Sequence, residues 1–482
     1  MSSRNFAFLA VAVVTLAAAS VSAEVPEQPT FTKDVLPILQ ESCQVCHRPN
    51  GANLGGMVAP MAFTTYAETR PWAKAIAKNV DSRTMPPWHA APEHSGVFVN
   101  ERSLSQDDID TLVTWANNGA VRGNPKDAPD MIEWPNSDGW TIGEPDLVLA
   151  MPEAYFVDDD VEDIYRNFDT KITSDLLPED RWMKAVEFRP GSPVVHHIIA
   201  RPLGGIAPGN DPTVHPDGLA TKLRTGTTVT WQMHYHKEPG AGTGMYDQSS
   251  VAIKFYPEDA EIEHVLDSES LGRFDFAIPA GDANYTMQVE HVFPRDSQIV
   301  SFLPHMHLRG KAATYEAFYP DGTSEMLLRV PAYDFNWQTT YRFDEFKDVP
   351  AGTKLVFTAI WDNSEDNPYN PDPTDTVFWG EPTTDEMGFG FMGFIETDPT
   401  QEPLEGTQRQ RRGMPPLTQI LSMMDADKDG KMSEEEARGP LKNFFGQMDQ
   451  NGDGFVDMEE AEAAQSMMGG SRGGRRGQRN SN

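Results

Sequence analysis

Cysteine is scarce in this sequence: its 482 residues include two, Cys43 and Cys46. No cysteine is left for a structural disulfide, so the core must be large enough to be stable without such crosslinks. Beyond residue 23, no stretch is long and apolar enough to span a bilayer. These absences exclude a small disulfide-based scaffold and predict a protein with no membrane span.

Basic residues are also few, with 39 Lys and Arg against 73 Asp and Glu and a formal net charge of −34. Nucleic-acid phosphates would repel such a chain, so we expect no nucleic-acid partner. The 38 Gly, 38 Pro and 10% aromatic residues favour a turn-rich β protein. The length is that of about two to four domains.

The first 23 residues have the pattern of a secretory signal peptide. One basic residue, Arg4, precedes an apolar run over 6–19, and Val21-Ser22-Ala23 is a small-residue cleavage pattern. The run is too short for a membrane span. We therefore expect an exported protein, either periplasmic or secreted, with signal peptide 1–23.

Both cysteines belong to Cys43-Gln44-Val45-Cys46-His47, which follows a helix predicted over 31–40. This is the attachment pattern of haem c: two thiols bind the haem and the histidine ligates its iron. A redox dithiol or half of a zinc site is less compatible with the trailing His47. Pro86 favours an extended backbone at Met85, which makes Met85 the best second axial ligand. Its rivals are Met57, Met61, His89 and His94.

Further helices are predicted over 71–80 and 105–118, the latter with a cap at Ser105. Together with Met85-Pro86-Pro87-Trp88, they make 30–122 resemble the cytochrome c domain found fused to copper monooxygenase-like modules of bacterial exported proteins. We expect this α-helical domain to be followed by a linker over 123–139.

From 140 to 398 the sequence changes to short alternating runs separated by turn residues, which predicts β-sandwiches. A seam at 278–281 divides this region into 140–277 and 278–398. Six of the twelve histidines fall in three tight pairs within these runs. His305 and His307 would share one face of a strand and could together bind copper or zinc. The other pairs are His196-His197 and His234/His236.

These histidines and Met387 follow the order and approximate spacing of the copper type II, ascorbate-dependent monooxygenases. Peptidylglycine α-hydroxylating monooxygenase and dopamine β-monooxygenase are members of that family. The resemblance implies an electron-relay copper at His196, His197 and His234. It also implies an oxygen-activating, catalytic copper at His305, His307 and Met387.

Two of these assignments have rivals, and one needs an irregular strand. His196 and His197 can reach one metal only if their strand ends or bulges there, because adjacent residues face opposite sides. His236 could replace His234, and Met392 could replace Met387. The isolated His215, His264 and His291 are expected to be surface or core residues.

The chain departs from the peptide-amidating members of the family, which hold a peptide carboxylate with polar residues. The corresponding positions are Leu303, Phe389 and Phe391, and a carboxylate would be left unpaired beside them. We therefore expect a small apolar or aromatic substrate.

Beyond a linker over 399–415, the chain contains two loops with the EF-hand pattern, in 416–465. Glycine stands at position 6 of each, and Met432 and Val456 at position 8 would pair the loops. The tail 466–482 is expected to be disordered. The expected calcium ligands are Asp425, Asp427, Asp429, Lys431, Ser433 and Glu436 in the first loop, and Asp449, Asn451, Asp453, Phe455, Asp457 and Glu460 in the second.

The predicted fold class is therefore multidomain: an α-helical cytochrome c domain, two tandem β-sandwich copper domains and a small α EF-hand pair. The predicted cofactors are covalent haem c, two copper ions and two calcium ions. The expected function is hydroxylation of a C–H bond of a small substrate with O2, with ascorbate or a redox protein as electron donor. The alternatives are a non-oxygenating haem and copper electron-transfer or copper-handling protein, and a calcium-dependent binding protein on a vestigial scaffold.

Overall fold

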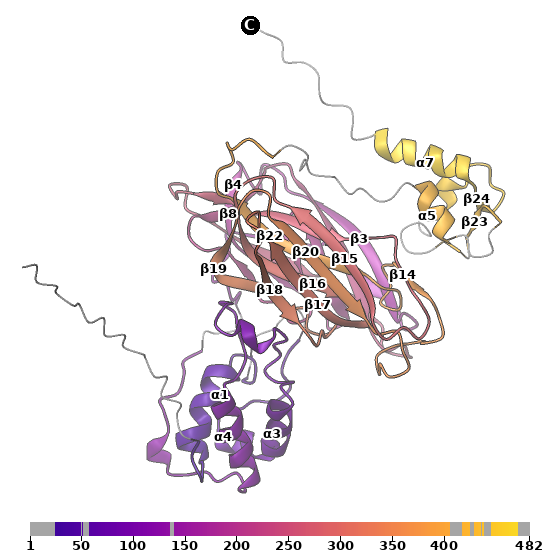
Figure 1. The fold of residues 1–482 in the computed structure, drawn as a ribbon. Coiled ribbons are helices and arrows are strands. Elements are labelled where there is room, and N and C mark those ends of the chain that lie inside the picture. The colour runs from indigo at the N-terminus through magenta and orange to yellow at the C-terminus, as the bar shows by residue number, and fades with distance from the viewer. Residues whose placement is uncertain are drawn as a thin grey trace, which may run out of the picture.

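The computed structural model of the protein is mostly β (Figure 1). It describes residues 25–49, 51, 57–134, 139–404, 417–424, 429–434, 436–437 and 445–470. The predicted signal peptide and residues 425–428 and 435 of the first calcium loop lie outside these residues. None of the helices among them is both long enough and apolar enough to cross a membrane.

The N-terminal part contains a small helical group around Leu39, Leu112 and Trp115, which are fully buried. Helix α4 begins where predicted, because the Ser105 side chain accepts a hydrogen bond from the Asp108 backbone N–H. The helices are η1 (Phe31–Val35), α1 (Leu36–Ser42), α2 (Tyr66–Thr69), η2 (Arg70–Trp72), α3 (Ala73–Asp81), η3 (Pro92–His94), α4 (Gln106–Asn117) and η4 (Pro125–Asp127).

Two sheets then enclose a core around Trp231, Tyr235 and Ile253, and we call this unit the first sandwich. One sheet has the order β1 (Leu147–Ala150), β11 (Ser250–Phe255), β4 (Arg181–Arg189), β8 (Leu219–Leu223), β12 (His264–Val265), with β7 (Thr213–Val214) on β4. The other has the order β3 (Asp163–Lys171), β9 (Thr228–His236), β5 (Val195–Arg201), β6 (Gly204–Ile206), and β10 (Met245–Asp247) pairs with β2 (Tyr155–Val157).

The second sandwich encloses Phe302, Tyr315, Phe357 and Trp361. Its β13 pairs with β22, so this unit begins near Asp267, before the expected seam at 278–281. One sheet has the order β13 (Asp267–Gly272), β22 (Gly388–Glu396), β16 (Ser297–Met306), β19 (Tyr341–Val349). The other sheet has the order β15 (Tyr285–Val292), β20 (Lys354–Trp361), β17 (Gly310–Phe318), β18 (Ser324–Val330). In addition, β14 (Ala277–Ile278) pairs with β21 (Val377–Phe378).

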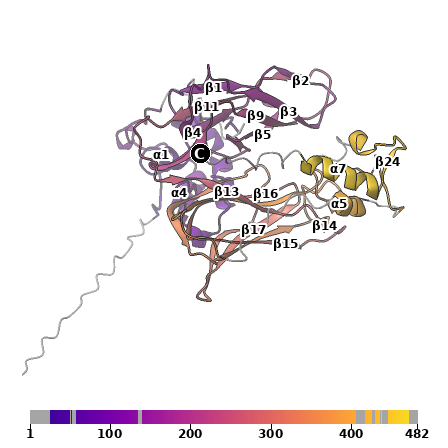
Figure 2. The ribbon, with the colours of Figure 1, turned by 90° about the horizontal axis from the view of Figure 1, so that it is seen from above.

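The two sandwiches lie one against the other, as the view from above shows (Figure 2). Side chains connect them: Thr383 of the second sandwich donates a hydrogen bond to Asp163 of the first, at 2.9 Å, and Gln232 of the first donates to Glu381 of the second, at 3.3 Å.

The predicted fold class is wrong about the N-terminal part. The chain is 35% strand and 15% helix, and no large α-helical cytochrome c domain is evident among the described residues. The physical reason lies in the segment after Pro86. Its Trp88 and Phe98 are buried in the core of the second sandwich, and Phe98 forms a β-bridge with Phe343. This segment therefore packs as part of the sandwich and not as part of a separate helical unit.

A small C-terminal unit, shown in yellow in Figure 1, has its own core. Its elements are α5 (Leu417–Met424), β23 (Met432–Ser433), β24 (Phe455–Val456) and α7 (Met458–Gly470). Met432 pairs with Val456, as the EF-hand pattern predicts.

Candidate metal centre

His196, His197 and His234 come together on β5 and β9 of the first sandwich. Each offers a ring nitrogen, and these nitrogens all lie within 4.8 Å of one another. The register of β5 against β9 shifts between Val195 and His197, which is the bulge that two adjacent ligands require. The structure thus brings the three predicted ligands of the relay site together.

Asp163 orients His234 from the neighbouring strand β3. Its Oδ1 lies 2.9 Å from His234 Nε2, and His234 Nδ1 lies 3.1 Å from His197 Nδ1. Because the carboxylate accepts the Nε2 proton, Nδ1 keeps its lone pair for a metal. Two ligands of one tetrahedral ion bonded at about 2.0 Å would lie roughly 3.3 Å apart, so the spacing suits shared coordination.

Burial opposes ionisation of Asp163, but hydrogen bonds from His234 and His236 hold its pKa below the ordinary value. His236 lies 3.6 Å from Asp163 Oδ2 and is exposed. It is therefore placed beside the carboxylate, while His234 occupies the ligand position.

The other two histidines of this cluster are kept neutral. Burial, with a smaller contribution from His234, lowers the pKa of His196 to about 3, and the same causes lower that of His197. Neither ring nitrogen of His196 has a hydrogen-bond partner. A neutral imidazole with free lone pairs is the metal-binding form, and a buried ring without partners is otherwise unfavourable.

His305 and His307 lie on and just beyond β16 of the second sandwich. His305 Nδ1 donates to Gln338 Oε1 at 2.7 Å, and His307 Nδ1 donates to the Asp385 carbonyl at 3.1 Å. Both oxygens can only accept, so each ring keeps a lone pair on Nε2. Burial lowers the pKa of both rings, to about 4 for His305.

Met387 lies next to Glu386, whose buried carboxylate accepts hydrogen bonds from the backbone N–H groups of His307 and Arg309, at 2.9 and 2.7 Å. The side chain of Glu386 thereby fixes the Met387 loop against the predicted histidine pair. The rival Met392 is buried in the core, and it pairs with Phe302 on the neighbouring strand β16. The Met392 side chain is therefore part of the hydrophobic core of the second sandwich.

Phe335 lies between the two histidine groups. Its ring stacks on His196 at a centroid distance of 4.9 Å and meets His307 edge to face at 5.9 Å. His305 is also close enough to lower the pKa of His196 and His197. The two predicted copper sites thus face each other across one aromatic ring.

The predicted haem attachment residues lie at the end of α1. His47 Nδ1 is 3.2 Å from the Met61 carbonyl, so it donates there and leaves Nε2 free for iron. The His47 ring also stacks on Phe63, with centroids 4.4 Å apart. Cys43 and Cys46 are free, half-buried thiols, and burial raises the pKa of Cys43 to about 12. This geometry fits covalent haem c with His47 as its proximal ligand.

The candidates for the second axial ligand differ in their surroundings. Met85 is half-buried and precedes a cis peptide bond to Pro86. The Met61 carbonyl is hydrogen-bonded to His47, so the Met61 backbone lies beside the predicted proximal ligand and not opposite it. His94 Nε2 accepts a hydrogen bond from the Arg329 backbone N–H, whereas His89 Nδ1 is buried without a partner. Met57 is half-buried.

The remaining isolated histidines lie outside the two histidine groups. His215 is buried near the Thr221 hydroxyl, while His264 and His291 are half-buried.

The second calcium loop groups carboxylate oxygens of Asp449, Asp453 and Glu460 within 4.8 Å of one another. Of the first loop, Asp425 and Asp427 lie outside the described residues. In its described part the Glu436 carboxylate accepts from the Ser433 backbone N–H at 2.8 Å.

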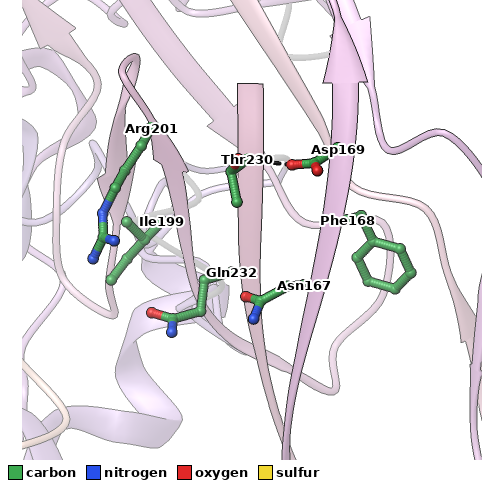
Figure 3. Close-up of a pocket in the computed structure, with 7 residues that line it drawn as sticks. All are labelled: Asn167, Phe168, Asp169, Ile199, Arg201, Thr230 and Gln232. Carbon is green, nitrogen blue, oxygen red and sulfur yellow. Dashed lines mark hydrogen bonds between the residues drawn. The ribbon is translucent and has the colours of Figure 1, made fainter. Parts of the chain in front are cut away.

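A groove of about 280 Å³ is lined by residues of β3, β5 and β9, and Figure 3 shows its lining residues. Gln232 precedes His234 by two residues on β9, and Ile199 follows His197 by two on β5. The residues that line the groove are Asn167, Phe168, Asp169, Ile199, Arg201, Thr230 and Gln232.

Comparison with known proteins gives little beyond the C-terminal unit. The EF hand family model matches residues 441–460. No curated protein matches the chain.

Matching solved structures include the major capsid protein P2 of bacteriophage PM2, which is 8% identical with a TM-score of 0.21 over 53% of this chain and 98% of that chain. Another is the infectious bursal disease virus VP2 subviral particle, 9% identical with a TM-score of 0.18 over 52% of this chain and 72% of that chain. The N-terminal tandem CBM22 domain of Paenibacillus barcinonensis Xyn10C is 11% identical with a TM-score of 0.12, and the match covers 53% of this chain and 94% of that chain. At such low TM-scores these structural similarities support no conclusion about the fold or function of this protein.

Sequence reasoning missed the residues that orient the candidate ligands, namely Asp163, Phe335, Gln338 and Glu386. Asp163 pairs with His236 on the adjacent strand β9, and this pairing of β3 with β9 is not visible in the sequence.

Proposed function

We propose that this chain is an exported, haem- and copper-dependent monooxygenase that hydroxylates a C–H bond of a small apolar or aromatic substrate. The observation that carries the proposal is the pair of facing histidine groups: His196, His197 and His234 on one sandwich, His305 and His307 on the other. Burial keeps the rings of His196, His197, His305 and His307 neutral by lowering their pKa values. Hydrogen bonds at the other ring nitrogen leave Nδ1 of His234, beside His197, and Nε2 of His305 and His307 available to a metal. Copper held there would supply one-electron chemistry and oxygen activation.

The residues assign different roles to the two groups. A three-imidazole set suits both oxidation states of copper, as an electron relay needs. On the second sandwich, the thioether of Met387 would join His305 and His307, and a soft sulfur ligand favours Cu(I). Phe335 keeps the two groups apart while touching both, so each can hold its own ion.

The surroundings of His305 support an apolar substrate. Phe391 lies across from Leu303, and Phe389 lies across from His305, so these side chains share the outer face of the sheet. The Phe391 ring is 6.4 Å from His305 and stacks on Phe389, yet it is 39% exposed. An exposed aromatic floor beside a metal ligand would bind an apolar molecule better than a charged one.

Haem c at Cys43, Cys46 and His47 would supply electrons, with ascorbate as an alternative or additional donor. Calcium at the C-terminal loops would complete the cofactors, with Asp449, Asp453 and Glu460 as ligands of the second ion.

The test is isotope incorporation from 18O2 into a panel of alkylbenzenes and short alkanes, using copper-loaded protein and ascorbate. We expect one labelled oxygen atom in the product, and its loss in the His305→Ala variant but not in the His264→Ala control. Normal reduction and reoxidation of haem and copper without labelled product from any panel member would contradict the proposal and favour electron transfer.

A further inference from the structure

One loop of the second sandwich contacts both histidine groups. We call residues 333–339 the bridging loop. Its Phe335 stacks on His196, and its Gln338 accepts a hydrogen bond from His305. The Tyr333 hydroxyl donates to the Met306 carbonyl at 2.8 Å, which anchors the loop beside the His305–His307 segment.

The same loop contacts the first sandwich through Trp337. The Trp337 ring packs so closely on Gly209 that a side chain at position 209 would meet it at 2.9 Å. The Gln338 backbone N–H also donates to the Pro208 carbonyl at 2.9 Å. Gly209 therefore allows an aromatic ring to rest directly on the backbone of the 207–211 turn.

The 207–211 turn is itself held by Arg102, which follows the predicted haem attachment residues in the N-terminal part of the chain. Arg102 donates to the Gly209 carbonyl at 3.4 Å and forms an ion pair with Asp211 at 2.8 Å. Both charged groups lie close enough to Cys46 to influence its thiol: burial raises the pKa of Cys46, Arg102 lowers it and Asp211 raises it. The predicted haem attachment residue Cys46 is thus within electrostatic range of the ion pair that holds this turn.

Together these interactions form a series from the haem attachment point to a relay ligand, in which an electrostatic interaction joins Cys46 to Arg102 and contacts or the chain itself join the other members. It runs from Cys46 past Arg102 to Gly209, then to Trp337, then through the loop to Phe335 and finally to His196. Electron transfer slows steeply across gaps between non-bonded groups, so stacked rings and direct van der Waals contact favour this series over a path through solvent.

We propose that Trp337 and Phe335 form the route by which electrons pass from haem c to the copper at His196, His197 and His234. The inference rests on the proposed haem and copper sites and adds the connection between them. One electron leaves the ferrous haem, which becomes ferric, and reduces Cu(II) to Cu(I). No bond forms or breaks in this step, and neither ring needs to give up a proton.

The experiment uses the full-length protein loaded with haem and copper, oxidised and without oxygen. A laser flash with a deazaflavin donor reduces a small fraction of the haem. Absorbance then follows haem reoxidation, and freeze-quench EPR follows the loss of Cu(II). We expect a first-order phase independent of protein concentration in which the two signals match.

The Trp337→Leu and Phe335→Leu variants should slow this phase on the order of tenfold, while Trp337→Phe, which keeps a ring, restores most of the rate. The matched control is Trp72→Leu, which removes a 41% exposed tryptophan of the haem-bearing part. The rate of direct copper reduction by ascorbate should stay unchanged in Trp337→Leu, which separates a lost route from a damaged copper site.

An intramolecular phase that is as fast in both leucine variants as in the unchanged protein would overturn the route. A protein with both metals and ascorbate-driven turnover, but without any intramolecular phase, would overturn the route and leave the proposed function standing. A protein that binds no copper would instead overturn the proposed function.

Discussion

At the scale of single residues, the candidate site depends on which nitrogen of each ring is free. Asp163 fixes His234, Gln338 fixes His305, and the Asp385 carbonyl fixes His307. Such partners set the tautomer and the direction of a metal ligand. The histidines alone would not specify either.

The Asp163→Asn substitution should therefore weaken copper binding at the relay site. The amide oxygen of Asn can still accept a hydrogen bond from His234, but it carries no negative charge to offset the charge of the metal, so we expect a loss of about 10- to 100-fold in affinity. Competition titration with a chromophoric copper chelator measures it. Asp169→Asn, an exposed aspartate on the same strand, is the control; equal weakening in both variants would contradict this role for Asp163.

The ligands themselves could be found from sequence because they occur as close pairs in alternating runs. Their partners could not be, since Asp163 lies 71 residues from His234, and Gln338 lies 33 residues from His305. Such pairings depend on which strands become neighbours. The bulge at His196 was foreseeable only as a requirement of two adjacent ligands, not from the residues around it.

At the scale of elements, the segment after Pro86 is the least expected feature. The periodic runs around Met183–Phe188, Thr227–Tyr235 and Lys354–Trp361 become β4, β9 and β20, and the capped run after Ser105 becomes α4. Local periodicity suffices for these elements. Trp88 and Phe98 have no such periodicity, and their burial depends on a distant sheet, so sequence alone assigned them to the wrong core.

Truncating these aromatic residues should destabilise the second sandwich although they precede its first strand, β13, in the sequence by about 170 to 180 residues. For Trp88→Ala or Phe98→Ala we expect a loss of about 3–5 kcal/mol in the free energy of unfolding, as for other large core residues. Chemical denaturation followed by circular dichroism in the β region measures it. Trp72→Ala, at an exposed site, should change stability by about 0.5 kcal/mol or less. A similarly small effect of Trp88→Ala would show that the segment is not part of the core.

At the scale of the whole molecule, two sandwiches bring their histidine faces together, and the N-terminal part contacts both through Arg102 and Phe98. The C-terminal unit differs, because its core consists of its own residues between Leu417 and Ala464. Calcium should therefore order that unit without altering the copper sites.

Glu460→Gln tests this separation, because it replaces a buried carboxylate that is a candidate calcium ligand of the second loop. Calorimetric titration of copper-free protein should show the loss of one calcium per chain, with copper binding unchanged. Glu459→Gln, at the exposed neighbouring position, is expected to bind calcium normally. A fall in copper content of the Glu460 variant would argue that calcium acts on the sandwiches.

The most direct test of the central claim is the number of copper ions per haem in the purified protein. The protein is loaded with copper, desalted and compared with the His305→Ala/His307→Ala double variant by metal analysis and the haem pyridine assay. We predict two coppers per haem, falling to one in the variant. No bound copper, or the same copper content in both proteins, would contradict this prediction.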